Sequence, residues 1–162
     1  MVHIAYSTDD LREELESIGY DHTEIKIAVD FTHDGESLPF DGGNWNLSYF
    51  LDTALQNLEK IQLSEPTAVA WTVDGGFRIT DQEAGDLICR IYSQFEDSEV
   101  AFRMPKQDFV DEVVRTAAEF QRDCVRILYD IDIEASKKRE MRDQLSTLGV
   151  VESKTSDRDE TE

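Results

Sequence analysis

The spacing of hydrophobic residues changes along this chain, and each change predicts a boundary between a strand and a helix. Over residues 23–32 apolar and polar residues alternate, which is typical of a half-buried strand. Over residues 46–62 apolar residues recur at helical spacing behind Asn46, a residue well suited to open a helix. A second helical stripe, from Phe109 to Ile131, predicts a long C-terminal helix.

The N-terminal segment predicts a short strand or lead-in followed by a helix. Ser7 is a suitable N-cap residue, and Leu11, Leu15 and Ile18 follow it at helical spacing. Gly19 fits the position just past the end of that helix.

The central part of the chain predicts strands. Residues 67–73 and 77–80 flank Asp74-Gly75-Gly76, which is a strong hairpin signal. Residues 86–95 fit either a helix or a strand, because their bulky residues satisfy both spacings, and the short distance to the neighbouring strands favours a strand. Residues 100–104 predict a further strand.

Together these elements predict one α+β domain over residues 1–148. Its antiparallel sheet of four to five strands is expected to pack on one face against the 46–62 helix and a C-terminal helix. That C-terminal helix spans 106–148 and is either long or broken near 130–134. Residues 149–162 are a polar tail, acidic and low in aromatic residues, that we expect to be disordered.

The strongest compositional feature is an excess of acid, with 36 Asp and Glu against 16 Lys and Arg and a formal net charge of −20. Such a chain is a poor general binder of nucleic acid or of anionic membranes, because both need Lys and Arg. Its acid, spread through nearly every segment, resembles that of proteins from salt-in halophiles, where screening removes self-repulsion. Mimicry of nucleic acid and pairing with a basic protein are the alternatives.

The charge is unevenly distributed. Residues 1–104 carry 21 acids and 6 bases, a net of −15, whereas residues 105–148 carry 10 acids and 8 bases, a net of −2. Ion pairs within a helix explain this neutrality most simply, and a surface that contacts another protein or a second copy of the chain is the alternative. The residues that we predict to form such a surface are Val110, Val114, Val125, Lys137, Lys138, Arg139 and Arg142.

No segment carries a motif strong enough to name a reaction, so we expect no catalytic residue, metal or cofactor. His33 lies in the acidic stretch 30–36, which could bind a metal but is more simply a solvated loop. Asp130 and Asp132 form an Asp-x-Asp pair, which in a helix is usually a solvated edge. The Gly-Gly pairs at 42–43 and 75–76 lack the Gly-Lys-Ser/Thr ending of a phosphate loop.

Cys89 and Cys124 are the only cysteines, and both lie in apolar periodic segments. They are expected to be core residues in a reducing compartment, although the sequence leaves open a disulfide between them. Trp45 and Trp71 are expected to anchor the core or a helix entry. The sequence has no signal peptide and no segment long enough to span a membrane, which predicts a cytoplasmic protein.

Residues 25–128 run through a strand, a turn-rich loop, an amphipathic helix, several strands and a long helix that opens Met-Pro-Lys-Gln-Asp-Phe-Val. This order, with Phe40-Asp-Gly-Gly-Asn-Trp-Asn-Leu-Ser-Tyr-Phe50 before the first long helix, resembles small immunity-type and other uncharacterised α+β proteins of prokaryotes. The resemblance covers about two-thirds of the chain and carries no catalytic residue.

These features favour a non-enzymatic binding or regulatory protein of a high-salt cytoplasm. It would act through its C-terminal helix on another protein or on a second copy of itself, with no evident small-molecule substrate. One alternative is a structural subunit that assembles through the same helix. The other is a small hydrolase or metal-dependent enzyme whose site is built from scattered acids.

Overall fold

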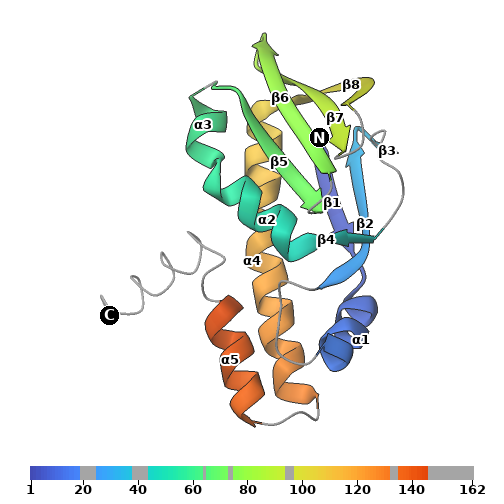
Figure 1. The fold of residues 1–162 in the computed structure, drawn as a ribbon, viewed down its shortest axis with the longest axis vertical. Coiled ribbons are helices and arrows are strands. Elements are labelled where there is room, and N and C mark those ends of the chain that lie inside the picture. The colour runs from blue at the N-terminus through green and yellow to red at the C-terminus, as the bar shows by residue number, and fades with distance from the viewer. Residues whose placement is uncertain are drawn as a thin grey trace.

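The computed structural model describes residues 1–18, 25–37, 44–63, 65–72, 75–93, 97–131 and 135–145. These residues form an α+β fold in which two antiparallel sheets pack against one long helix (Figure 1). The predicted fold class and the long C-terminal helix are therefore confirmed. The strands fall into two sheets, however, where the sequence had suggested a single sheet of four to five strands.

The first sheet has four strands: β1 (Val2–Tyr6), β2 (Lys26–His33), β3 (Glu36–Ser37) and β4 (Asn44–Asn46). Strand β2 is its centre and pairs antiparallel with each of the other three. Strands β3 and β4 have only two and three residues. The sequence reasoning missed both, because an alternating pattern needs a longer segment to be recognised.

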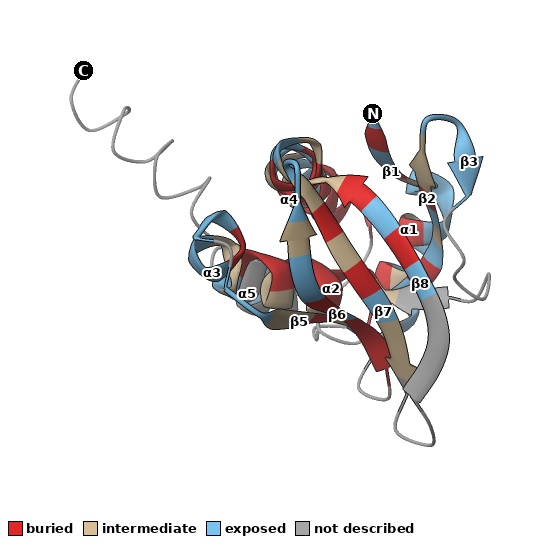
Figure 2. Ribbon diagram, turned by 90° about the horizontal axis from the view of Figure 1, so that it is seen from above, coloured by how far each residue is buried: buried red, intermediate tan, exposed pale blue. Residues whose placement is uncertain are grey.

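The second sheet follows chain order: β5 (Thr67–Thr72), β6 (Gly75–Glu83), β7 (Asp86–Ser93) and β8 (Asp97–Pro105). The predicted hairpin is confirmed by the antiparallel pairing of β5 with β6. The ambiguous segment 86–95 is a strand over its described part, as its short spacing had indicated. Figure 2 shows buried residues alternating with exposed ones where β8 approaches the long helix.

The helices are α1 (Thr8–Ile18), α2 (Leu47–Gln56), α3 (Leu58–Gln62), α4 (Lys106–Asp130) and α5 (Ala135–Leu145). The caps follow the sequence: Ser7 Oγ accepts from the Asp10 N–H at 3.3 Å, and Asn46 Oδ1 accepts from the Tyr49 N–H at 3.1 Å. The single helix expected over 46–62 is divided at Asn57.

Asn57 explains this division. Its side-chain amide donates to the carbonyl of Thr53, at 2.8 Å, and to that of Ala68 on β5, at 3.3 Å. The bond to β5 ties the end of α2 to a strand that lies 11 residues further along the chain. Helix geometry is interrupted to make this contact, with Asn57 at φ −102° and ψ 6°.

Helix α4 packs against more of the other elements than a peripheral helix would, and it joins the two sheets. Its 25 residues span roughly 37 Å, and it contacts β1, β8 and every other helix of the described chain. Near its start, Phe109 stacks on Phe31 of the first sheet, with ring centroids 6.3 Å apart, and meets Phe77 of the second sheet edge-on at 5.9 Å. The two sheets therefore share one hydrophobic core.

Side chains from the helices seal one edge of each sheet. On β1 the N–H of Ile4 donates to Glu112 Oε2 at 2.6 Å, and its carbonyl accepts from the Arg115 guanidinium at 3.1 Å. On β5 the Thr53 hydroxyl lies 3.2 Å from both the N and the O atom of Ala70. Backbone groups that would otherwise offer pairing sites to another strand are thereby satisfied.

Candidate functional site

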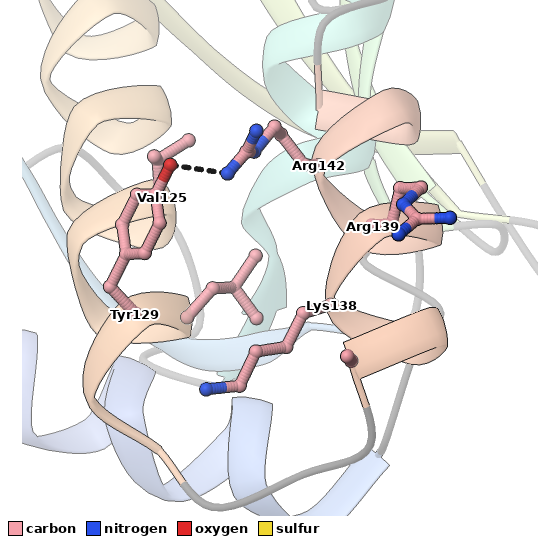
Figure 3. A pocket seen from close by; sticks show the side chains of 7 residues that line it. Val125, Tyr129, Lys138, Arg139 and Arg142 are labelled. Carbon is pink, nitrogen blue, oxygen red and sulfur yellow. Dashed lines mark hydrogen bonds between the residues drawn. The ribbon is translucent and has the colours of Figure 1, made fainter.

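Helices α4 and α5 lie side by side and enclose a groove of about 270 Å³ (Figure 3). Helix α4 contributes Val125, Leu128 and Tyr129, which share one face because they are spaced by three and four residues. Ile131 caps α4 with extended backbone and is itself buried. The chain reverses beyond this residue, so α5 packs back against the C-terminal half of α4.

The opposite wall comes from α5. Ala135, Lys138, Arg139 and Arg142 recur at intervals of three, four and seven residues from the first, which places them along one face of that helix. Three of these four side chains are basic. The wall of the groove formed by α5 is therefore cationic, although the protein as a whole has a net charge of −20.

The floor of the groove is apolar and its mouth is aromatic. Leu128 is only 4% exposed and Val125 is half-buried against the core. Tyr129, in contrast, is 66% exposed, and the other large hydrophobic residues this exposed in the described chain are Met1 and Leu63. An apolar floor with an exposed aromatic ring beside it is the usual chemistry of a surface that receives a side chain of another molecule.

Arg142 is fixed against the tyrosine. Its guanidinium donates to the Tyr129 hydroxyl and lies 5.1 Å from the centre of the ring (Figure 3). Both contacts hold the guanidinium at the mouth of the groove. An anion that binds there would therefore lose less side-chain entropy than one that had to order a free arginine.

Lys138 and Arg139 have no hydrogen bond or ion pair to the residues that the structure describes. The side chains of Lys137, Glu140 and Glu134 lie outside the described residues. The ion pairs within a helix that the sequence predicts would here join the basic residues to these two glutamates, and they stay a prediction. Over its whole length α5 carries four bases and two acids, a net of +2. Local electrostatics thus favour a negatively charged group at this rim.

The structure brings together four of the residues predicted for a partner surface: Val125, Lys138, Arg139 and Arg142. The prediction for Val110 is wrong, because this residue is 5% exposed and belongs to the core. Val114 is half-buried on α4 outside the groove.

Sequence reasoning missed Tyr129. Tyr129 lies four residues after Val125 and outside the stripe of buried residues, so the sequence places it on the same face of the helix as Val125. The sequence does not show that a second helix lies opposite this face and completes a groove.

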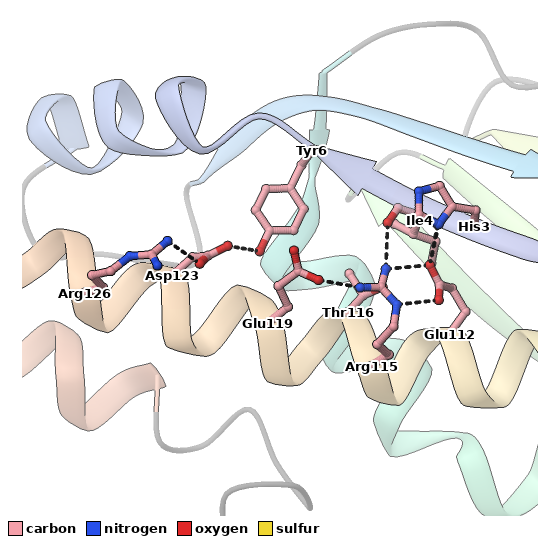
Figure 4. A network of polar contacts seen from close by, with 9 residues as sticks. All are labelled: His3, Ile4, Tyr6, Glu112, Arg115, Thr116, Glu119, Asp123 and Arg126. Carbon is pink, nitrogen blue, oxygen red and sulfur yellow. Dashed lines mark hydrogen bonds and ion pairs between the residues drawn. The ribbon is translucent and has the colours of Figure 1, made fainter.

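A second hollow, of about 630 Å³, lies where β1 crosses the start of α4. Most of its charged groups pair with one another, while Asp111 accepts from the side-chain amide of Gln107 at 2.8 Å. Arg115 donates to both carboxylate oxygens of Glu112 at 2.7 Å and also to Glu119, and His3 Nδ1 lies 3.4 Å from Glu112 (Figure 4). The N-terminal amine lies 3.8 Å from Asp108. This set fastens β1 to α4, and we assign it a structural role.

The same row of polar contacts continues along α4. The Tyr6 hydroxyl donates to Asp123 at 2.8 Å, and Arg126 donates to the other oxygen of Asp123 at 2.7 Å (Figure 4). Burial, together with the hydrogen bond to Asp123, raises the pKa of the Tyr6 phenol. This tyrosine therefore stays neutral and holds the end of β1 in place.

The other candidates from the sequence are dispersed. His33 Nε2 lies 3.4 Å from Asp34, and Asp130 pairs with Arg12 at 3.2 Å on the surface, while Asp132 lies outside the described residues. The described part of the chain contains no group of three potential metal ligands. Trp71 packs against the core beside Phe77, with ring centroids 6.0 Å apart.

Both cysteines are free and buried, as expected of core residues. Burial raises the pKa of the Cys89 thiol to about 12 and also raises that of Cys124. The thiol forms are therefore favoured, and the core position of both residues explains their presence. The side chain of Trp45 and the Gly-Gly pair at 42–43 lie outside the described residues.

None of the described helices combines the length and apolar character needed to cross a bilayer. Comparisons with known proteins return no match: no family model fits the chain, no curated protein is similar to it, and no solved structure matches it. The resemblance to small immunity-type proteins therefore stays a prediction from the sequence.

Proposed function

We propose that this protein is a non-enzymatic binding or regulatory protein of a high-salt cytoplasm, and that it holds another protein in the groove between α4 and α5. The observation that carries the proposal is the combination of an apolar floor at Leu128 with Lys138 and Arg139 at the rim, two bases that pair with none of the residues that the structure describes. On a chain with 20 more negative than positive charges, a cationic site is an exception, and it attracts negatively charged groups.

The position of the other polar groups supports a binding function over a catalytic one. Along the β1–α4 junction, Glu112 accepts from the N–H of Ile4, and Asp123 accepts from the Tyr6 hydroxyl and from Arg126. Their hydrogen bonds hold secondary structure together. A catalytic acid or base must be able to form a hydrogen bond with its substrate. The oxygen atoms of these three side chains already form hydrogen bonds within the protein.

Site-specific photocrosslinking tests the proposal. Tyr129 is replaced with the photoreactive residue p-benzoylphenylalanine, and Leu63, a similarly exposed apolar residue on another part of the surface, is replaced in the same way as a matched control. Irradiation of cells grown at high salt should give one discrete adduct from position 129 that is lost when Arg139→Glu is added. A chain that gives no such adduct, or equal adducts from both positions, does not use the groove.

A further inference from the structure

We infer that the groove receives an acidic segment of its partner in which one apolar side chain is flanked by carboxylates. This inference rests on the proposed function and names the chemistry of the partner. It follows from three features of the described residues: the volume of the groove, the arrangement of its charges and the small amount of exposed apolar surface around it.

The volume limits what can enter. A groove of about 270 Å³ is smaller than the roughly 300–1,000 Å³ of typical small-molecule pockets, and it is open to solvent between two helices. It has room for one side chain, with the backbone of the incoming segment lying across its mouth. The floor at Val125 and Leu128 is apolar, so the entering side chain must be apolar as well.

The charges specify what lies on either side of that side chain. Arg142 stands at the mouth against Tyr129, while Lys138 and Arg139 stand along the same wall of α5. Carboxylates on both sides of the apolar anchor would meet these bases. Arginine binds a carboxylate through two parallel hydrogen bonds, which adds directional specificity to the attraction.

The apolar surface argues against a second copy of the chain as the occupant. Stable dimers bury about 1,200–2,000 Å² in total and are more apolar when they are obligate. Among the residues of α4 and α5 whose burial the structure describes, Tyr129 is the large hydrophobic residue that is highly exposed. A short segment with one anchor fits this surface better.

Fluorescence anisotropy with defined peptides tests the inference on the full-length protein. The probe is a fluorescein-labelled peptide with one leucine between runs of glutamate. The comparison peptides replace the leucine with serine, or the glutamates with lysine. All titrations are made at about 2 M KCl, where the Debye length is about 2 Å, so that only contact-range charge pairs contribute.

The glutamate–leucine peptide should bind at least tenfold more tightly than either comparison peptide, which corresponds to about 1.4 kcal/mol. Arg139→Glu should weaken its binding by at least tenfold. Arg90→Glu is the matched control, since Arg90 is an exposed arginine on β7 and the change in net charge is identical. Tyr129→Ala should also weaken binding, whereas Leu63→Ala should leave it unchanged.

The outcomes separate the two proposals. If the lysine or serine peptide binds as tightly as the probe and Tyr129→Ala weakens it, the groove is a binding site but the inferred chemistry is overturned. If no peptide binds and position 129 gives no adduct, both proposals are overturned. A mass in solution twice that of the chain, reduced to one chain by Tyr129→Ala, assigns the groove to a second copy and overturns the inference.

The chain's own C-terminal segment is a further source of acid, with five acids and two bases in residues 149–162. A full-length variant in which those five acids are replaced with their amides tests this source. If only that variant binds the glutamate–leucine peptide, the native segment competes for the groove, and the inference of a separate partner is overturned. Equal binding by both forms supports it.

Discussion

Glu112 and Arg115 act on Ile4 as a neighbouring strand would. The carboxylate accepts from the N–H of Ile4 at 2.6 Å, and the guanidinium donates to its carbonyl at 3.1 Å. The two side chains also bond to each other, which keeps the acceptor and the donor at the correct spacing. A salt bridge on the surface of a helix thus completes the hydrogen bonding of a strand.

Replacing Glu112 with alanine should lower the free energy of unfolding by roughly 2–3 kcal/mol, because the buried N–H of Ile4 and the Arg115 guanidinium both lose their acceptor. Urea denaturation measures this loss. Glu119→Ala is the control, since Glu119 also pairs with Arg115 but is far more exposed. It should change the unfolding free energy by no more than about 0.5 kcal/mol. Equal effects would contradict the role assigned to Glu112.

The pH dependence provides a second measure of the same pair. Burial raises the pKa of Glu112, but the hydrogen bonds from Arg115 and from the Ile4 N–H outweigh it and hold this pKa below its ordinary value. The stabilisation is therefore complete above the unfolded pKa of about 4.3 and is lost as the pH falls through the lower folded pKa. The difference between the wild type and Glu112→Ala should shrink over this acidic window.

At the scale of elements, Gly76 sets the contact between β5 and β6. A Cβ atom at this position would lie 2.1 Å from the Val69 carbonyl oxygen and 2.6 Å from the Ala70 Cα, both in the backbone of the neighbouring strand. The pairing of the two strands is irregular between Ala70 and Thr72. Gly76 pairs with Ala70, and the two strands lie too close together there for any side chain at Gly76.

Gly76→Ala should therefore lower the free energy of unfolding by about 3 kcal/mol or more, since backbone atoms cannot move aside as a side chain does. Gly35→Ala is the comparison: its φ is +83° and its added Cβ would meet nothing within 4 Å. Backbone strain alone predicts a loss of about 1–2 kcal/mol there. Thermal and urea unfolding measure the loss of unfolding free energy in each variant. A loss for Gly76→Ala that is smaller than the loss for Gly35→Ala would contradict the close approach of the two strands.

Local patterns predicted the elements well where the residues that define them are near in sequence. Ser7 and Asn46 were recognisable as N-caps because their partners are three residues away. Gly76 was interpreted as part of a turn, because the approach of Val69 depends on strand pairing. The division of the 46–62 helix at Asn57 depends likewise on a bond to Ala68, which no helical pattern contains.

At the scale of the whole molecule, charge dominates. The excess of acid in residues 1–104 is 15, and exposed carboxylates repel one another when salt is scarce. The same uneven distribution pointed to the C-terminal helices, where Val125 lines one groove with the bases of α5. It could not reveal Tyr129, because the groove exists only after the chain reverses and sets α5 against α4.

The melting temperature should rise by at least roughly 5 °C between about 0.1 and 2 M KCl, as screening removes this repulsion. Calorimetry measures the shift. Helix α1 offers a control, because it carries five acids and one base. The double variant Glu13→Gln and Glu16→Gln changes exposed side chains and should reduce the dependence on salt. A melting temperature that does not change with salt would contradict adaptation to a salt-rich cytoplasm.

The hydrogen bonds of Glu112 and Arg115 to Ile4 also determine when, during synthesis, the edge of β1 can pair with other extended segments. Ile4 and Glu112 are 108 positions apart, so the first two long strands leave the ribosome well before the helix that covers their edge. At about 5–20 residues per second, this interval lasts roughly 5–20 s. Throughout it, Ile4 offers an open N–H and carbonyl to any extended segment nearby. A chaperone that protects the edge of β1 is therefore needed after Ile4 has been synthesised, and it is no longer needed once α4, which carries Glu112, has packed against β1.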